Sequence, residues 1–293
     1  MYWVTKAKLE RRFWWGYGFL VIVGLGSGLF HGTLTYWTQL LDEVPMLFGS
    51  SNFIYCAFDP WLVRPPLWAQ IAIYTYPAWV TAVYIMNRSV DFFQIFYGLM
   101  PVTIGFQAMG LRRYFAHAVP GAMDSPAEGS FGDENATTTE ISVPFSRPTP
   151  RLATVLGPTT PRILYLGMFS YLFGWLHWLA DNLLCYSHLL PLKEQVGYPW
   201  RFFLELHGFW HWWSGYGSYL IVTYLVAARV NVVARDPRAE NARHAVAWSE
   251  GGKVWDTGVR WIGGFLPVIV VGSEARQMHA ATAAAAGKGK KKQ

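Results

Sequence analysis

The sequence predicts an all-α, polytopic membrane protein whose transmembrane helical bundle has six spans. Of its 293 residues, 53% are hydrophobic and only 14% are charged, whereas soluble domains usually carry about 25% charged residues. Apolar runs recur along the chain, and a helix needs about 20 such residues to cross a bilayer. Sixteen Trp and sixteen Tyr fit aromatic belts at the two membrane interfaces.

A short basic segment, residues 1–12, opens the chain, and a first membrane region follows at residues 13–110. Four helices are expected in this region, at 13–34 (with an extension to 41 as the alternative), 45–58, 67–86 and 90–110. The boundary near residue 45 is predicted because Pro45 follows two acidic residues and proline suits the first turn of a helix.

The composition changes at residues 111–161, which are rich in Pro, Ser, Thr and Gly. We interpret this stretch as a disordered loop insertion. A second membrane region, residues 162–228, is expected to hold spans at 163–184 and 202–228. Residues 229–293 are interpreted as a polar cytosolic tail. Its apolar patch at 261–271 is too short to cross a membrane and is expected to be interfacial or re-entrant.

The net charge of +6 gathers at the ends of the chain and in one set of loops. It indicates membrane topology and attraction to anionic lipids. It does not indicate a nucleic acid partner, because no basic face with interleaved aromatic residues lies outside the membrane segments. The positive-inside rule places both termini in the cytosol. The lysine-rich end, GKGKKKQ, favours the endoplasmic reticulum, with the Golgi as the alternative. Cys56 and Cys185 are interpreted as two isolated structural thiols.

Five polar residues stand out in apolar surroundings as candidates for a functional site: Ser27, His31, Asp42, His207 and His211. The serine and the first histidine are four residues apart, which puts them on one face of a helix. The last two histidines have the same spacing at the start of another apolar run. Three imidazoles with a nearby carboxylate suit a catalytic zinc ion. The site is not that of a zincin protease, because Gly208 stands where H-E-x-x-H requires glutamate.

The strings around these residues carry a family resemblance. G-S-x-x-F-H-x-T-L followed by Q-x-x-D-E-x-P-M resembles the signature of the alkaline ceramidases, which are integral membrane amidases. The later H-x-x-x-H followed by S-G-Y-G-S-Y, and D-N-x-x-C at residues 181–185, are similar to further motifs of this family. The resemblance covers nearly the whole chain, with the motifs in the same order.

The resemblance implies that zinc is bound by His31, His207 and His211. It further implies that Asp42 accepts a proton from the attacking water and that Ser27 stabilises the oxyanion. The implied substrate is a ceramide within the bilayer, phytoceramide or dihydroceramide, which would be hydrolysed to a sphingoid base and a fatty acid. The implied partners are therefore this substrate and membrane lipids, and the oligomeric state stays open.

The family has seven helices, and its first helix and the preceding acidic, calcium-binding segment have no match here. We therefore expect no calcium ligands. Either the sequence starts downstream of the natural start, or the protein lacks this helix. Two alternatives remain open: a zinc-binding membrane receptor of the adiponectin and progestin type, and an inactive, N-terminally truncated ceramidase-like protein.

Simpler roles are favoured for the remaining polar residues of the membrane regions. Glu43 is interpreted as a solvated or capping carboxylate. His177 and Asp181 are interpreted as forming a structural hydrogen bond in the bundle and not as metal ligands. The aromatic run at residues 210–213 fits an interface belt and bundle packing, with the lining of an acyl pocket as the alternative.

Overall fold

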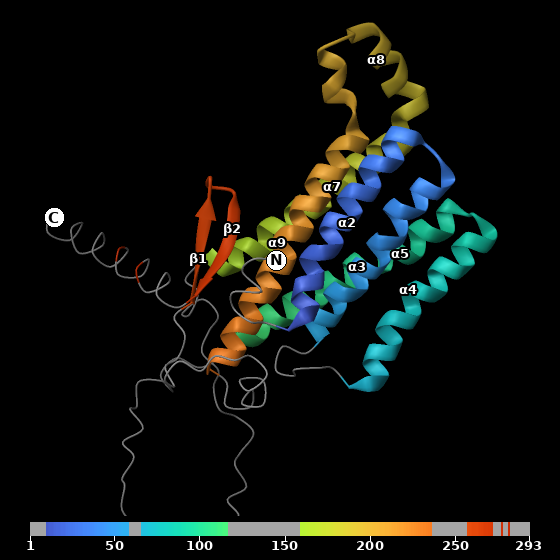
Figure 1. Cartoon of the computed structure of the whole chain (residues 1–293). Coiled ribbons are helices and arrows are strands. Elements are labelled where there is room, and N and C mark those ends of the chain that lie inside the picture. The colour runs from blue at the N-terminus through green and yellow to red at the C-terminus, as the bar shows by residue number, and fades with distance from the viewer. Residues whose placement is uncertain are drawn as a thin grey trace, which may run out of the picture.

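The computed structural model of the protein describes residues 10–58, 66–116, 159–235 and 257–271, together with residues 277 and 281. Within these residues the chain forms a bundle of six long helices with a small β-hairpin beside it (Figure 1). The long helices are α2 (Arg11–Thr33), α3 (Tyr36–Phe58), α4 (Leu67–Asn87), α5 (Val90–Ala116), α7 (Thr159–Leu184) and α9 (Leu206–Arg235). The expected all-α membrane bundle is therefore confirmed.

Three helical stretches are long and apolar enough to cross a membrane by length and composition: Arg11–Thr33, Val90–Leu111 and Pro161–Val196. The outer faces of the bundle carry large apolar side chains, among them Leu25, Met86 and Phe106, which are 66%, 84% and 73% exposed. A water-soluble protein rarely leaves so many such side chains in contact with solvent. Lipid is the environment that this surface fits.

The helix boundary predicted at Pro45 is wrong. Helix α2 ends at Thr33, where Leu34 adopts a left-handed conformation (φ 52°) and its N–H bonds the carbonyl of Phe30. Thr35 then precedes α3 and accepts the backbone N–H of Thr38 on its hydroxyl, as a capping residue does. Pro45 lies inside α3, because proline is tolerated within membrane helices whose neighbours satisfy the freed carbonyl. The chain reverses before Asp42, so this residue returns alongside α2.

Small residues let the helices that carry the site approach closely. A Cβ on Gly26 of α2 would lie 2.0 Å from the carbonyl oxygen of Leu41 on α3. Between α7 and α9, a Cβ on Gly217 would lie 2.7 Å from the backbone nitrogen of Tyr171, and one on Gly174 would lie 2.9 Å from that of Ser214. Backbone contact of this kind is typical of helix pairs in membranes. It fixes α2 against α3 and α7 against α9.

A compact excursion connects α7 to α9 at one end of the bundle (Figure 1). It consists of a π-helical turn (Cys185–Leu189), helix α8 (Leu190–Val196) and a 3-10 turn (Trp200–Leu204). The ammonium of Lys193 lies 2.9 Å from the carboxylate of Glu205, and its hydrogen bond lowers the pKa of that carboxylate. The ion pair holds the excursion next to the first residue of α9, two residues before His207.

Four predicted boundaries shift. The expected insertion at 111–161 falls mostly outside the described residues, but its first residues continue α5 to Ala116 and its last ones begin α7 at Thr159. Likewise, α2 already begins at Arg11 and α9 continues to Arg235, past the expected start of the tail at residue 229. Residues 1–9 of the predicted basic segment and residues 236–256 of the tail lie outside the described part of the chain.

The apolar patch expected at 261–271 is part of an antiparallel hairpin, with β1 at Thr257–Ile262 and β2 at Leu266–Val271. Gly263 and Gly264 turn the chain with positive φ angles of 62° and 82°, which only glycine adopts without strain. The sequence carried this signal, a Gly-Gly pair between apolar runs, but we interpreted the run as an interfacial patch.

Candidate functional site

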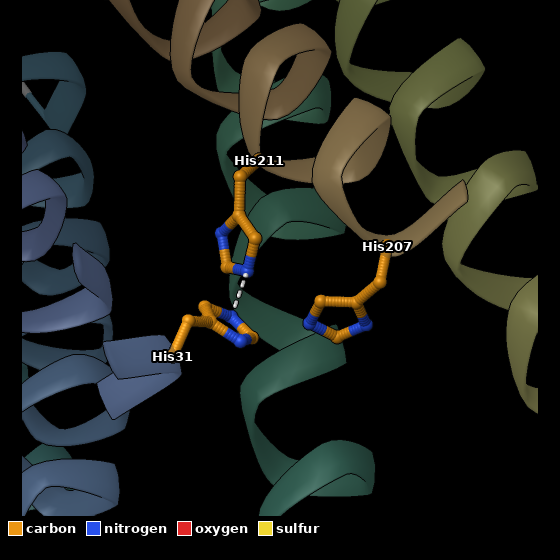
Figure 2. A group of neighbouring side chains, drawn as sticks. All are labelled: His31, His207 and His211. Carbon is orange, nitrogen blue, oxygen red and sulfur yellow. Dashed lines mark hydrogen bonds between the residues drawn. The ribbon is translucent and has the colours of Figure 1, made fainter. Parts of the chain in front are cut away.

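Three histidines, from the first and the last of the long helices, converge at one end of the bundle. His31 lies in the last turn of α2, and His207 and His211 lie in the first turns of α9. Figure 2 shows the three imidazoles facing one another, with one ring nitrogen of His207 turned toward the other two rings and one turned away. One ligand nitrogen from each ring falls within 4.8 Å of the others.

This geometry can hold a metal ion. The Nε2 atoms of His31 and His211 are 3.1 Å apart. Two nitrogens bound tetrahedrally to zinc at about 2.05 Å would be about 3.3 Å apart. The ring of His207 completes the group, with its centroid 5.2 Å from that of His31 and 4.9 Å from that of His211. Among the histidines, cysteines and carboxylates of the described residues, these three histidines have the spacing that suits a metal ion.

Ser27 lies where its spacing from His31 predicted. It is buried on α2, one turn before His31, and its hydroxyl oxygen is 3.4 Å from Nδ1 of His211. The hydroxyl therefore faces the histidine group and can donate a hydrogen bond into the space beside it.

Asp42 lies on the neighbouring helix, next to Ser27. The close approach of Gly26 to the backbone of Leu41 and Asp42 brings the two side chains within interaction range. Asp42 is 5% exposed, and its Oδ1 has no hydrogen-bond partner among the described residues. A buried carboxylate oxygen without a partner is costly, and its burial beside a cavity indicates that a ligand or a water pairs with it.

Two cavities meet at this site. A cavity of about 560 Å³ lies between α2, α3 and α9 and is lined by Ser27, His31 and His211. A second cavity, of about 830 Å³, lies between α3, α5, α7 and α9 and is lined by Asp42, His207 and His211. Both have the volume of a typical ligand site. Most of the other lining residues are aliphatic or aromatic, so the site is suited to an apolar ligand with one polar group.

Contacts test the interpretations of Glu43 and His177. Glu43 is not a cap, because it lies inside α3, and it is not a free solvated carboxylate, because it is half-buried and accepts hydrogen bonds from Tyr84 at 2.5 Å and from Gln39 at 3.1 Å. His177 lies outside the histidine group and bonds the carbonyl of Phe173, one turn earlier. The structural role expected for His177 is thus supported, although its partner is its own helix.

The expected pairing of His177 with Asp181 is not the one that forms. Instead, Oδ2 of Asp181 lies 3.7 Å from Nδ1 of His207, on the side away from the other two histidines. The sequence offered one clue, since Asp181 ends an apolar run just as His207 begins one. Both cysteines are free, as expected.

Sequence reasoning missed Tyr97 and Tyr171. Their hydroxyls are 2.9 Å apart, and both residues line both cavities. No sequence signal distinguished them from the other tyrosines of the apolar helices. Trp210, in the aromatic run at 210–213, also lines both cavities, which agrees with the pocket-lining alternative.

Comparison with known proteins connects this geometry to a family. The model of the ceramidase family matches residues 1–252. Alkaline ceramidase 3 of Mus musculus is 24% identical over 237 residues, which cover 80% of this chain and 73% of the relative. Alkaline ceramidase YPC1 of Saccharomyces cerevisiae is 29% identical over 241 residues, 77% of this chain and 64% of the relative.

A third relative, the putative alkaline ceramidase dcd3B of Dictyostelium discoideum, is 24% identical over 229 residues, which cover 77% of this chain and 67% of the relative. The aligned part of the chain therefore spans 64–73% of the length of these relatives. The family match includes all three histidines, Ser27 and Asp42, and ends before the β-hairpin.

Proposed function

Because the chain belongs to the ceramidase family, we propose that it hydrolyses the amide bond of ceramides and releases a sphingoid base and a free fatty acid. The observation that carries the proposal is the convergence of His31, His207 and His211, with ligand nitrogens within 4.8 Å, at the point where two largely apolar cavities meet. A ceramide has a similar layout, with two hydrocarbon chains that meet at an amide.

We propose zinc as the ion. Three imidazoles and an open side are the donor set of catalytic zinc sites. When bound, zinc supplies a Lewis acid that polarises a carbonyl oxygen and activates water. His31, His207 and His211 would hold it, and Asp181, whose Oδ2 lies 3.7 Å from Nδ1 of His207, is the carboxylate placed to orient that imidazole, as carboxylates commonly do for metal-binding histidines.

Asp42 and Ser27 divide the remaining chemistry in this proposal. Asp42 accepts a proton as the oxygen of water bonds to the amide carbon. It then passes that proton to the amide nitrogen as the carbon–nitrogen bond breaks. The hydroxyl of Ser27 donates to the carbonyl oxygen as negative charge develops there. The unpartnered Oδ1 of Asp42 and the orientation of Ser27 toward His211 support these roles.

The site opens among apolar helix faces, so a lipid would reach it without leaving the membrane. We propose phytoceramide and dihydroceramide as the preferred substrates and the membrane of the endoplasmic reticulum as the location, with the Golgi as the alternative. Turnover of matched ceramide species and the position of a fluorescent fusion in cells test these two points.

The central test is the turnover of a fluorescent ceramide at alkaline pH by the purified protein, with and without a chelator. We expect chelation to stop turnover and added zinc to restore it. His207→Ala should lose both zinc and turnover. His177→Ala is the matched control, because it removes an imidazole from the same end of the bundle but outside the group, and it should retain both. A His207→Ala protein that keeps zinc and turnover would refute the assignment. Bound zinc without turnover would favour a receptor or an inactive relative.

A further inference from the structure

The β-hairpin Thr257–Val271 lies beyond the residues that match the family, yet it is docked on the bundle. It runs beside α9 (Figure 1), and two tyrosines of that helix hold it. Tyr216 donates its hydroxyl to the carbonyl of Phe265 at 2.6 Å, and Tyr219 donates to the carbonyl of Pro267 at 2.8 Å. Val259 and Ile269 belong to the same buried cluster as the residues of α9.

The two hydrogen bonds between α9 and the hairpin suit an apolar environment. The edge of a strand leaves unpaired carbonyls and N–H groups, and within a membrane each of these must find a partner inside the protein. Phe265 is the last residue of the turn and Pro267 is the second residue of β2, so the two tyrosines bind carbonyls at the start of this strand. Tyr216 and Tyr219 are three residues apart and share one face of α9. Pro267 has no N–H, so no donor is left unpaired at that position.

Tyr219 also faces the site, because it lines the cavity of about 560 Å³ between α2 and α9. Its ring centroid lies 5.8 Å from that of Tyr17 on α2, and the hydroxyl of Tyr17 lies 3.0 Å from that of Thr223 on α9. The lining residues of the cavity begin at Phe19 on α2 and end at Tyr219 on α9. Tyr219 is therefore the lining residue of α9 that lies farthest along the helix from the histidines, and the Tyr17 ring and the Tyr17–Thr223 contact lie next to it.

The distance between His211 and Tyr219 sets the length of hydrocarbon chain that fits in the cavity. His211 and Tyr219 are eight residues apart on one helix, which corresponds to about 12 Å. A hydrocarbon chain whose amide lies at the histidines would run along α9 and meet this ring. We propose that Tyr219, supported from behind by the hairpin, is the floor of this cavity and limits the length of the hydrocarbon chain that the protein accepts. The proposal rests on the proposed function, which places the reacting bond at the histidines.

Two assays test the floor. One measures the turnover of two ceramide series, which vary the acyl chain and the sphingoid chain separately. The other measures the thermal stabilisation of the metal-stripped protein by saturated fatty acids of increasing length, and it requires no catalysis. Tyr219→Ala should raise the ratio of long-chain to short-chain preference about tenfold, the value for burying roughly two further CH₂ groups. Tyr219→Phe keeps the ring but loses the bond to Pro267 and should shift the ratio in the same direction by less.

Two further variants make the test specific. Tyr216→Ala removes the other tyrosine that holds the hairpin, but Tyr216 does not line the cavity, so its chain-length profile should shift by no more than that of Tyr219→Phe. Gly24→Leu adds a side chain to the cavity wall at a position where a Cβ meets nothing within 4 Å. It should fold normally and shift preference to shorter chains, which keeps the proposal open to refutation even if Tyr219→Ala does not fold.

The floor is refuted if Tyr219→Ala and Gly24→Leu leave both profiles unchanged, or if Tyr216→Ala changes them as much as Tyr219→Ala does. An unchanged profile in Tyr219→Phe refutes the supporting role of the hairpin. The proposed function fails separately: fatty acid binding with the expected length shifts, but without ceramide turnover, would uphold the floor and reject the amidase.

Discussion

Replacing Gly26 with alanine tests whether close packing of α2 on α3 creates the site. The added Cβ would lie 2.0 Å from the carbonyl oxygen of Leu41 and 3.1 Å from the backbone nitrogen of Asp42. Backbone atoms of a helix cannot rotate away as a flexible side chain can. Because real contacts of this kind are essentially never under 3.0 Å, the helices must separate by about 1 Å at this crossing.

The expected losses of stability and of turnover in Gly26→Ala follow from this displacement. Overpacking of a tight interface costs about 1–3 kcal/mol, and the better helix propensity of alanine offsets about 0.5–1 kcal/mol of it. We therefore expect a net loss of stability of about 1–2 kcal/mol. The effect on turnover should be larger, because Gly26 is adjacent to Ser27 and the clash lies against Asp42. A misplacement of about 1 Å can reduce a rate by about 100-fold.

The assay combines unfolding of the purified protein, its zinc content and the turnover of ceramide. Gly24→Ala is the matched control: it lies two residues earlier on the same helix, where a new Cβ meets nothing within 4 Å. It should be as stable as the natural sequence, or more stable by about 0.5–1 kcal/mol, and should keep its zinc content. If Gly26→Ala behaves like Gly24→Ala, the contact does not position the site and this reasoning is wrong.

Three further predictions concern the polar contacts around the site. Tyr84→Phe removes the 2.5 Å hydrogen bond to Glu43 and should cost about 1.5–3 kcal/mol of unfolding free energy; unchanged denaturant unfolding would contradict this. Because Lys193 lowers the pKa of Glu205 from 4.5, this ion pair should stabilise the fold above about pH 4.5 and lose its effect as the pH falls through the lower folded-state pKa. Glu205→Gln should therefore flatten the acidic part of a plot of melting temperature against pH, and an equally steep acidic fall in the variant would reject the contribution. Asp181→Asn should weaken zinc binding about 10–100-fold in a competition titration with a chelator, and unaltered affinity would show that this carboxylate does not orient its imidazole.

Much of the architecture was predictable because it depends on local composition. Apolar runs of membrane length are interrupted by polar breaks, so the existence and the order of the six long helices followed from the sequence. The exact boundary between α2 and α3 did not, because Pro45 is a helix breaker in water and a tolerated residue inside a membrane helix. The true boundary depends on Leu34, a residue with no turn propensity that adopts a left-handed conformation.

The partners of individual polar groups could not be predicted in the same way. Glu43 carries no mark that separates a solvated carboxylate from one bonded by Tyr84, which lies 41 positions away. The contact of Asp181 with His207 joins two helices, whereas helix periodicity reports only neighbours three or four positions apart on one helix.

By itself, the sequence determined the kind of protein and the identity of the candidate ligands, because hydrophobicity and the four-residue spacing of imidazoles are properties of short segments. Only the tertiary structure decided how Asp42 turns back to lie beside Ser27, which imidazole Asp181 faces, and that Tyr219 separates a cavity from a β-hairpin. Each of these depends on how closely two distant helices approach, and this distance is set by small residues and backbone contacts that act only after the chain has folded.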